Sequence, residues 1–228
     1  MRNAIGGFGL VWVAALGLLA TGSVWAPEAG AGLVVPDPGL PPVTGEYVSD
    51  PDTQILNYGG AVQGRDVHLF GFENIVRENV GADELLKCDA SLTAIVTSFP
   101  GDPTVMFEGP MEILVFGKVG QTAGTFTAEV LSLAADAAGV PGVLLRESPT
   151  LASVGSVTVT DLGGGTWTID SFFDVFTDLS PDGGANWLPD VAAGAGHRLT
   201  LLPEPASAAL MLAGLALAAR RVRRGRRG

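Results

Sequence analysis

The stretch "SVTVTDLGGGTWTI" (156–169) decides the fold class, because it holds two alternating runs joined by three glycines. In each run apolar side chains alternate with polar ones, which is the period of a strand with one buried face. Gly163, Gly164 and Gly165 can supply the positive φ angles that a tight turn between antiparallel strands requires. The stretch therefore predicts a β-hairpin.

The same period of two continues on both sides of this hairpin, between turns rich in Gly, Pro and Asp. We expect ten short strands, at 53–58, 66–72, 90–98, 104–108, 112–117, 124–133, 142–146, 156–160, 166–177 and 197–202. Residues 79–87 are the one segment for which we predict a helical turn. Strands of this length and spacing predict an all-β domain, built as an antiparallel β-sandwich of the jelly-roll or immunoglobulin-like type.

The first 31 residues have the composition of a secretory signal peptide. Arg2 precedes an apolar run, and small and polar residues follow that run. Cleavage after Ala26 and cleavage after Ala31 both fit the small-residue rule, and Pro27 favours the second site. Residues 32–52 hold five prolines, so we expect an extended lead-in before an exported domain at 53–202.

The other end of the chain pairs an apolar run with a basic block. Residues 206–219 carry no charge, and at ~1.5 Å per residue they extend about 21 Å, which is short of a hydrocarbon core of ~30 Å. A core helix is therefore the alternative to a transmembrane helix. We favour the membrane because six arginines would hold the far end on the cytoplasmic side. They are Arg220, Arg221, Arg223, Arg224, Arg226 and Arg227.

Pro203, Glu204 and Pro205 stand directly before this apolar run. The order of motif, helix and arginine cluster at 203–228 resembles the PEP-CTERM sorting signal of Gram-negative bacteria. The resemblance implies that an exosortase recognises the tail in the inner membrane and removes it. It also implies delivery to the cell surface or to an exopolysaccharide matrix after a transient stay in the inner membrane. For the domain in front of the tail it implies no function.

The exported part is strongly acidic. Residues 32–202 contain 22 Asp and Glu but only 6 Lys and Arg, which leaves them near −16. This charge disfavours nucleic acid and anionic lipid as partners. Cys88 is the single cysteine, so we expect no internal disulfide and a buried, inert thiol.

The stretch "SPDGGANW" (180–187) is the most informative one inside the domain. Ser180, Asp182, Gly184 and Trp187 match the Asp-box pattern, which resembles hairpin turns in sialidase-like propellers and other β proteins. The resemblance implies a structural role: Ser and Asp bond turn amides, Gly takes a positive φ, and Trp packs over the turn. Contact with calcium or a sugar is the alternative.

Other polar residues give weaker signals. Asp174, Asp178 and Asp182 are spaced by four, unlike the ligands of an EF-hand. His68 and His197 are the only histidines, and we expect them to be packed or surface residues. No G-x-S-x-G, H-E-x-x-H, P-loop or Cys-x-x-Cys motif occurs in the sequence.

Taken together, these features predict a non-enzymatic, exported surface or matrix protein that associates with exopolysaccharide. We expect no cofactor and no metal site, with calcium as the open alternative. The first competing hypothesis is a carbohydrate-binding module in which Trp167 and Trp187 stack on sugars. The second is a secreted hydrolase, although nothing marks out Glu46, Glu73 or any other carboxylate pair as catalytic.

Overall fold

A computed structural model describes residues 32–203, except residues 54, 99–100, 192–193 and 195. The predicted signal peptide, Glu204, Pro205, the transmembrane segment 206–219 and the six tail arginines lie outside the described residues. Within the described part, no helix is long and apolar enough to cross a membrane.

The described chain is all-β, as the sequence predicted, and its regular elements are thirteen strands. They are β1 (Leu33–Val35), β2 (Tyr47–Val48), β3 (Leu56–Tyr58), β4 (Val62–Val80), β5 (Asp83–Val96), β6 (Thr104–Val115), β7 (Gly124–Ala137), β8 (Leu144–Glu147), β9 (Ser153–Gly163), β10 (Thr166–Val175), β11 (Thr177–Ser180), β12 (Leu188–Pro189) and β13 (His197–Leu201). The predicted hairpin is confirmed as β9 and β10, and Gly163, Gly164 and Gly165 all have positive φ.

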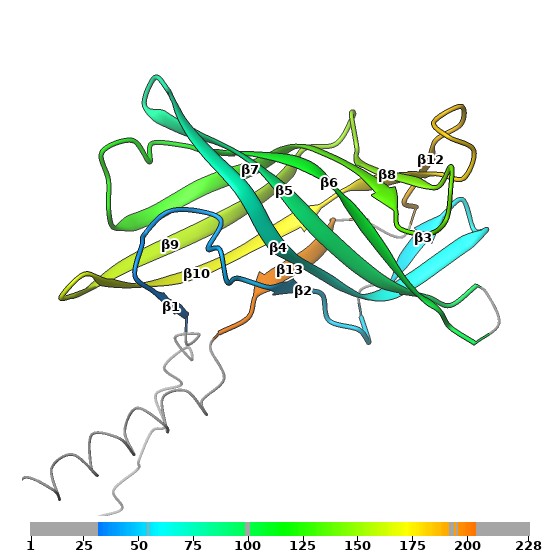
Figure 1. The fold of residues 1–228 in the computed structure, drawn as a ribbon, viewed down its shortest axis with the longest axis horizontal. Coiled ribbons are helices and arrows are strands. Elements are labelled where there is room, and N and C mark those ends of the chain that lie inside the picture. Colours follow the sequence, from blue (N-terminus) through cyan, green and yellow to red (C-terminus); the bar gives the residue numbers. More distant parts are fainter. Residues whose placement is uncertain (1–31, 54, 99–100, 192–193, 195, 204–228) are drawn as a thin grey trace, which may run out of the picture.

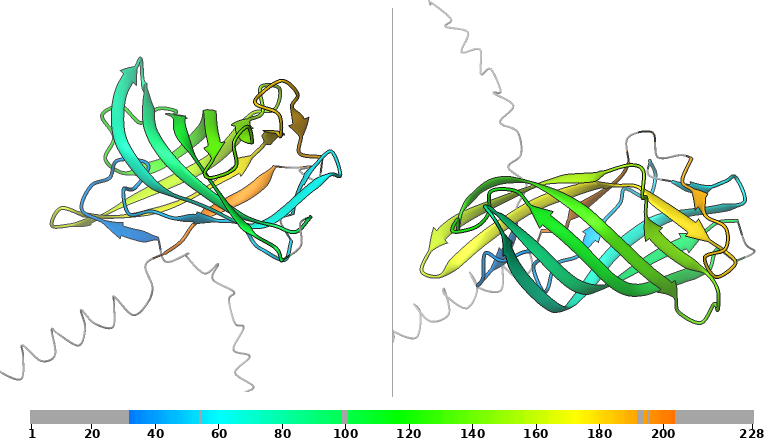
Figure 2. Two further views of the ribbon diagram at one scale, coloured as in Figure 1. Left: turned by 45° about the vertical axis from the view of Figure 1, so that its right-hand side comes forward. Right: turned by 90° about the horizontal axis from the view of Figure 1, so that it is seen from above.

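Eight strands form a closed antiparallel barrel (Figures 1 and 2). Around the ring the order is β2, β4, β5, β6, β7, β9, β10 and β13, which is also their order in the chain, and β13 pairs with β2 to close it. We had expected two packed sheets. Alternation along each strand does not separate the two architectures, because both bury every second side chain. The long-range pairing of β13 with β2 decides between them.

Several positions in the wall are occupied by two successive strands instead of one continuous strand. β7 pairs with β9 along its first half and with β8 near its end. β10 continues as β11, which pairs with β8 and β12. β3 pairs with β4 beyond β2, and Tyr58 of β3 forms a bridge with Asp190 after β12. The barrel wall is therefore interrupted at these positions, and polar side chains lie around the interruptions.

The barrel interior is filled by side chains from every second position. The burial pattern of β5 alternates along Leu86, Cys88, Ala90 and Leu92, each of which is buried. Tyr47 packs against Phe72 and Phe173 with ring centroids 6.0 and 5.7 Å away. Each fully buried large apolar side chain contributes about 1.5–3 kcal/mol, so the filled interior is the main source of stability.

The proline-rich segment 32–52 belongs to the barrel and is not a lead-in. β1 pairs with β10, and β2 pairs with both β4 and β13. Leu40 is buried, and its carbonyl accepts a hydrogen bond of 3.3 Å from Nε of Arg77. The prolines break the period of two, so the sequence pattern concealed two strands that are only three and two residues long.

The helical turn predicted at 79–87 is wrong, because this segment is the tip of the β4–β5 hairpin. Val80 pairs with Asp83, and Gly81 takes a φ of 67° in the turn. Lys87 on β5 donates to Glu78 on β4 across the hairpin at 3.1 Å. In so short a window, the same apolar and charged residues fit a helical period, and cross-strand pairing overrides it.

The predicted strands at 104–108 and 112–117 form one continuous strand, β6. Gly109 in its middle meets β7 closely, because a Cβ atom on Gly109 would overlap the carbonyl oxygen of Ala134. The neighbouring atoms are backbone, so they cannot move aside as the end of a flexible side chain would. A residue without a side chain is therefore required at this crossing.

We expect Gly109→Ala to lower the free energy of unfolding by about 1–3 kcal/mol, because the backbone of β7 must move to admit the methyl group. Urea unfolding measures the change. Gly194→Ala is the control, since no atom of the described residues lies within 4 Å of the position that its Cβ would take. Equal losses in both variants would contradict the steric explanation.

Candidate functional site

The Asp-box residues form a hydrogen-bonded turn between β11 and β12. The Ser180 hydroxyl donates to Oδ1 of Asp182 at 2.9 Å and accepts from the Gly184 amide at 2.9 Å. Asp182 also accepts from the backbone amide of Asn186 at 2.8 Å. The side chain and backbone of Asn186, with the Ser180 hydroxyl, lower the pKa of the Asp182 carboxyl below its usual value. Gly184 has a φ of 89°.

Trp187 leaves this turn and stacks on Arg146 of β8. The centre of the Arg146 guanidinium lies 4.0 Å from the centroid of the indole ring. Asp178, directly opposite on β11, accepts from Nη2 of Arg146 at 2.9 Å and from Nε at 3.2 Å. The Asp178 side chain is only 10% exposed, so this ion pair holds the guanidinium plane, and with it the indole, in one orientation.

An open groove of about 230 Å³ lies beside this stack, over the paired ends of β7 and β8. Trp187 and Arg146 line one part of it, and Ala134, Asp136 and Leu144 line the rest. The groove thus combines an aromatic ring, a guanidinium, an exposed carboxylate and a small apolar floor. This is the composition of a site for a small ligand with both apolar and hydroxyl-bearing faces.

A second open cleft, of about 340 Å³, lies where a loop separates β8 from β9. Glu147 lines it, and the hydroxyl of the fully buried Ser153 donates to Oε1 of Glu147 at 3.1 Å. Burial, together with the charges of Glu129 and Asp178, raises the pKa of Glu147 to about 7, although the hydrogen bond from Ser153 opposes the shift. Sequence reasoning missed Glu147, because its environment depends on a strand break that no local pattern marks.

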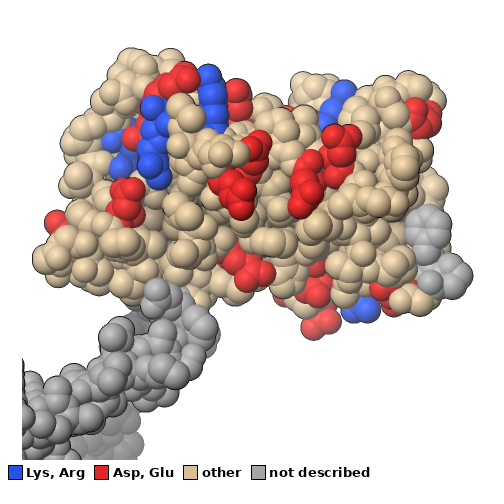
Figure 3. Space-filling view, viewed as in Figure 1, with Lys and Arg blue, Asp and Glu red and all other residues tan. Residues whose placement is uncertain are grey.

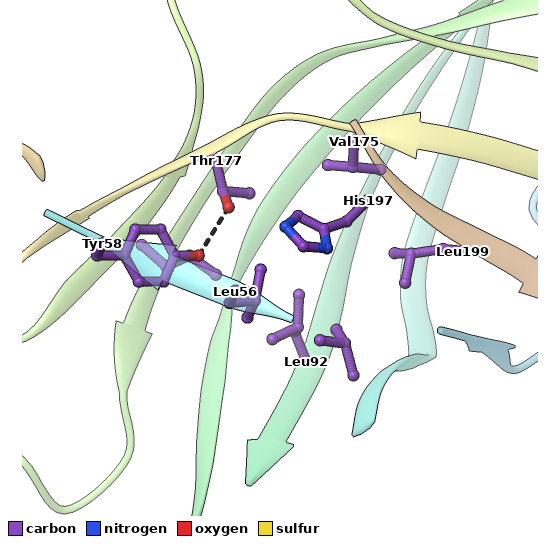
Figure 4. A pocket seen from close by; sticks show the side chains of 9 residues that line it. Leu56, Tyr58, Leu92, Val175, Thr177, His197 and Leu199 are labelled. Atoms are coloured by element: carbon purple, nitrogen blue, oxygen red, sulfur yellow. Dashed lines mark hydrogen bonds between the residues drawn. The ribbon is translucent and has the colours of Figure 1, made fainter. Parts of the chain in front are cut away.

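The barrel interior holds a small cavity, of about 20 Å³ (Figure 4). Tyr58 and Thr177 line it and share a hydrogen bond of 2.7 Å between their hydroxyls. That volume suits about one water molecule, whereas small-molecule sites usually take about 300–1,000 Å³. The interior is therefore too full for a small-molecule ligand, and the outer grooves are the better candidates for a binding site.

His197 projects into this interior cavity (Figure 4), and it also contacts Asp190. Nε2 of His197 meets Oδ2 of Asp190, and the two side chains are 6% and 1% exposed. Oδ1 of Asp190 accepts from the Asn57 amide at 2.9 Å. Through Asp190, which follows β12, the pair links β13 to β3, which indicates a structural role in closing the wall.

The two tryptophans proposed as a sugar-stacking pair do not lie together. Trp167 stands near the start of β10, opposite Val35 of β1, and its Nε1 is enclosed. Trp187 follows β11, at the other end of the same bent strand (Figure 1). A shared platform is therefore wrong, and of the two rings Trp187 is the one that borders the open groove over the paired ends of β7 and β8.

The remaining candidates form separate local contacts. His68 bonds Glu46 at 2.6 Å, and Asp174 pairs with Arg198 at 2.8 Å. Cys88 is buried, as predicted, and burial raises the pKa of its thiol to about 11. Glu73 lies exposed on β4. Across the described part of the chain, no three His, Cys, Asp or Glu side chains are placed to hold a metal ion.

Comparison of the chain with protein-family models, with curated proteins and with solved structures finds no match. Its function must therefore be inferred from the sequence of the two ends and from the geometry of the grooves.

The Asp-box turn yields a stability prediction. Ser180→Ala removes the acceptor of the Gly184 amide in a fully buried position, which should cost about 1–3 kcal/mol of unfolding free energy. Chemical denaturation measures this loss. Ser156→Ala on β9 is the matched control, because no hydrogen bond of its side chain supports a turn in the described structure. Similar midpoints for Ser180→Ala and the parent protein would show that the turn does not need the hydroxyl.

The Glu147 cleft yields a pH prediction. Its folded pKa, about 7, lies above the ordinary value of 4.5, so the folded state binds the proton more tightly. The contribution of protonated Glu147 to the free energy of unfolding is complete below about pH 4.5 and is lost as the pH rises through about 7. Glu147→Gln should therefore reduce the fall in Tm between pH 5 and pH 8. The exposed Glu108→Gln serves as control. Parallel Tm curves for Glu147→Gln and the parent protein would contradict the assignment.

Proposed function

We propose that this chain is an exported, non-enzymatic protein of the cell surface or extracellular matrix, associated with exopolysaccharide and sorted by an exosortase. In this proposal a signal peptide at 1–31 exports the barrel, and the segment 206–219 anchors it transiently in the inner membrane. Removal of the tail then releases it. The tail sequence that begins at Pro203 carries the proposal.

The position of that motif relative to the barrel supports the proposal. β13 ends at Leu201, and the Leu202 amide donates to the Glu46 carbonyl at 2.8 Å. Pro203 follows directly and cannot donate to a further ladder bond. The barrel therefore ends where the proposed recognition segment begins, so a membrane protease would meet that segment next to a fixed support.

The entry and exit of the described chain lie next to each other. Leu33 of β1 pairs with Ile169 of β10, and Thr200 of β13 pairs with Phe172 of the same strand (Figure 1). The barrel is therefore attached through one region of its wall, and the rest projects away from that region. This arrangement suits a domain that is displayed from a membrane and later released.

The surface also suits an extracellular location. Figure 3 shows acidic side chains spread over one face of the barrel, with basic side chains gathered mainly towards one end. A large net charge of one sign keeps a protein soluble and discourages self-association. The closed ring leaves few strand edges that could pair with other molecules. Both properties favour persistence outside the cell.

Mass spectrometry of protein extracted from the cell surface tests the proposal. We expect a mature chain that begins after Ala31 and ends at about Pro205. Replacing the six tail arginines with serine should leave export intact and impair retention and processing, because the tail loses its cytoplasmic hold. A surface protein with an intact C-terminus at Gly228, in a host that has an exosortase, would contradict the sorting mechanism.

A further inference from the structure

We propose that the groove beside Trp187 binds a sugar unit of a neutral polysaccharide. This site deepens the proposed function, on which it rests, by naming the chemical class of the matrix partner. It depends on three parts of the groove: the aromatic wall, the polar groups at its rim, and the small floor between them.

The aromatic wall is presented in a fixed orientation. Trp187 is half-buried, and the Ser180–Asp182 turn and the Arg146 stack hold it. Gly184 lies close to the ring, because a Cβ on Gly184 would stand 3.8 Å from Cζ2 of Trp187. A pyranose presents one face of C–H groups, and the pre-oriented indole can cover that face with the side of the ring that Arg146 does not cover, at little loss of conformational entropy.

The rim of the groove supplies both a hydrogen-bond acceptor and a hydrogen-bond donor for sugar hydroxyls. The Asp136 carboxylate, exposed on β7, accepts hydrogen bonds, and the Arg146 guanidinium donates them. Asp178 has already fixed the guanidinium through two hydrogen bonds, so binding does not have to order it. A hydroxyl group can meet both partners, since it is at once a donor and an acceptor.

The floor sets the size of the ligand. Ala134 and Leu144 line the groove together with the aromatic wall and Asp136, and the short Ala134 side chain keeps it open, with a volume of about 230 Å³. That is below the ~300–1,000 Å³ of sites that enclose a drug-sized ligand. The groove therefore suits one ring of a polymer whose neighbouring units remain outside.

The negative net charge of the domain favours a neutral polysaccharide over an anionic one. The exported residues are near −16, and the Arg146 guanidinium in the groove is already paired with Asp178. A polysaccharide rich in uronate or sulfate would meet net repulsion, which a neutral glycan does not. We therefore assign a neutral hexose polymer, and an anionic polymer serves as the negative control.

Affinity electrophoresis of the processed, surface-extracted protein tests this assignment, with dextran, galactomannan and alginate in separate gels. We expect retardation by at least one of the two neutral polymers and none by alginate. Trp187→Ala should weaken that binding at least tenfold. Asp136→Ala, an exposed change that leaves the turn intact, should weaken it several-fold.

Two controls keep the test sharp. Trp167 lies near the start of β10, far along the strand from Trp187, so Trp167→Phe should not change binding. Once residues 1–31 are removed, this variant also leaves Trp187 as the sole tryptophan. In this background, addition of the bound polymer should shift the Trp187 fluorescence. Asp170→Ala, exposed on β10, controls for loss of one negative charge.

Retardation by neither neutral polymer would overturn the inference. So would unchanged binding in both Trp187→Ala and Asp136→Ala with native circular dichroism, or retardation by alginate alone. Failure of the sorting proposal would look different, as an intact C-terminus. A correctly truncated surface protein that binds neither neutral polymer would overturn the sugar site alone.

Discussion

Pairing of β13 with β2 is the constraint on which the rest of the structure depends. These two strands stand at opposite ends of the described sequence, and their ladder joins Leu201 to Tyr47. Tyr47 then reaches across the interior, where its hydroxyl bonds that of Ser171 at 2.8 Å and its ring packs against Phe72 and Phe173. Closing so long a loop is costly in chain entropy. The buried aromatic cluster supplies the compensation at the point of closure.

The sequence was sufficient to predict local structure but insufficient to predict that the sheet closes into a barrel. The Gly163–Gly165 hairpin was predictable because alternation and positive-φ residues occur within one short window. β1 and β2 were missed because they are short and lie among prolines, and their pairing partners are far away in the chain. The hairpin tip at Gly81 was mistaken for a helix because a few residues fit both periods. The first failure concerns strands whose pairing is long-range, whereas the second concerns a short local segment whose pattern fits both a helix and a hairpin.

In the candidate site, too, contacts between residues close in sequence were predictable and contacts between distant residues were not. Ser180, Asp182 and Gly184 could be predicted as a turn, since their contacts are local. The stack of Trp187 on Arg146 could not, because β8 and the turn meet only after the barrel wall forms. Glu147 gave no sequence signal, and its raised pKa arises from burial at a break in the wall. Chemistry at this surface therefore depends on where the strands are interrupted.

The attachment of the chain at β13 has a mechanical consequence. β13 lies between β10 and β2, and the exit at Leu202 directly follows the strand. A pull on the tail would load the hydrogen bonds of both ladders together, in shear, and would not open them one after another. The Trp187 groove stands at the far end of the β10–β11 strand from β1, so tension between a polymer and the tail would run along the barrel wall. If the tail anchors the chain as proposed, such a domain would resist extraction by drag forces until the tail is removed.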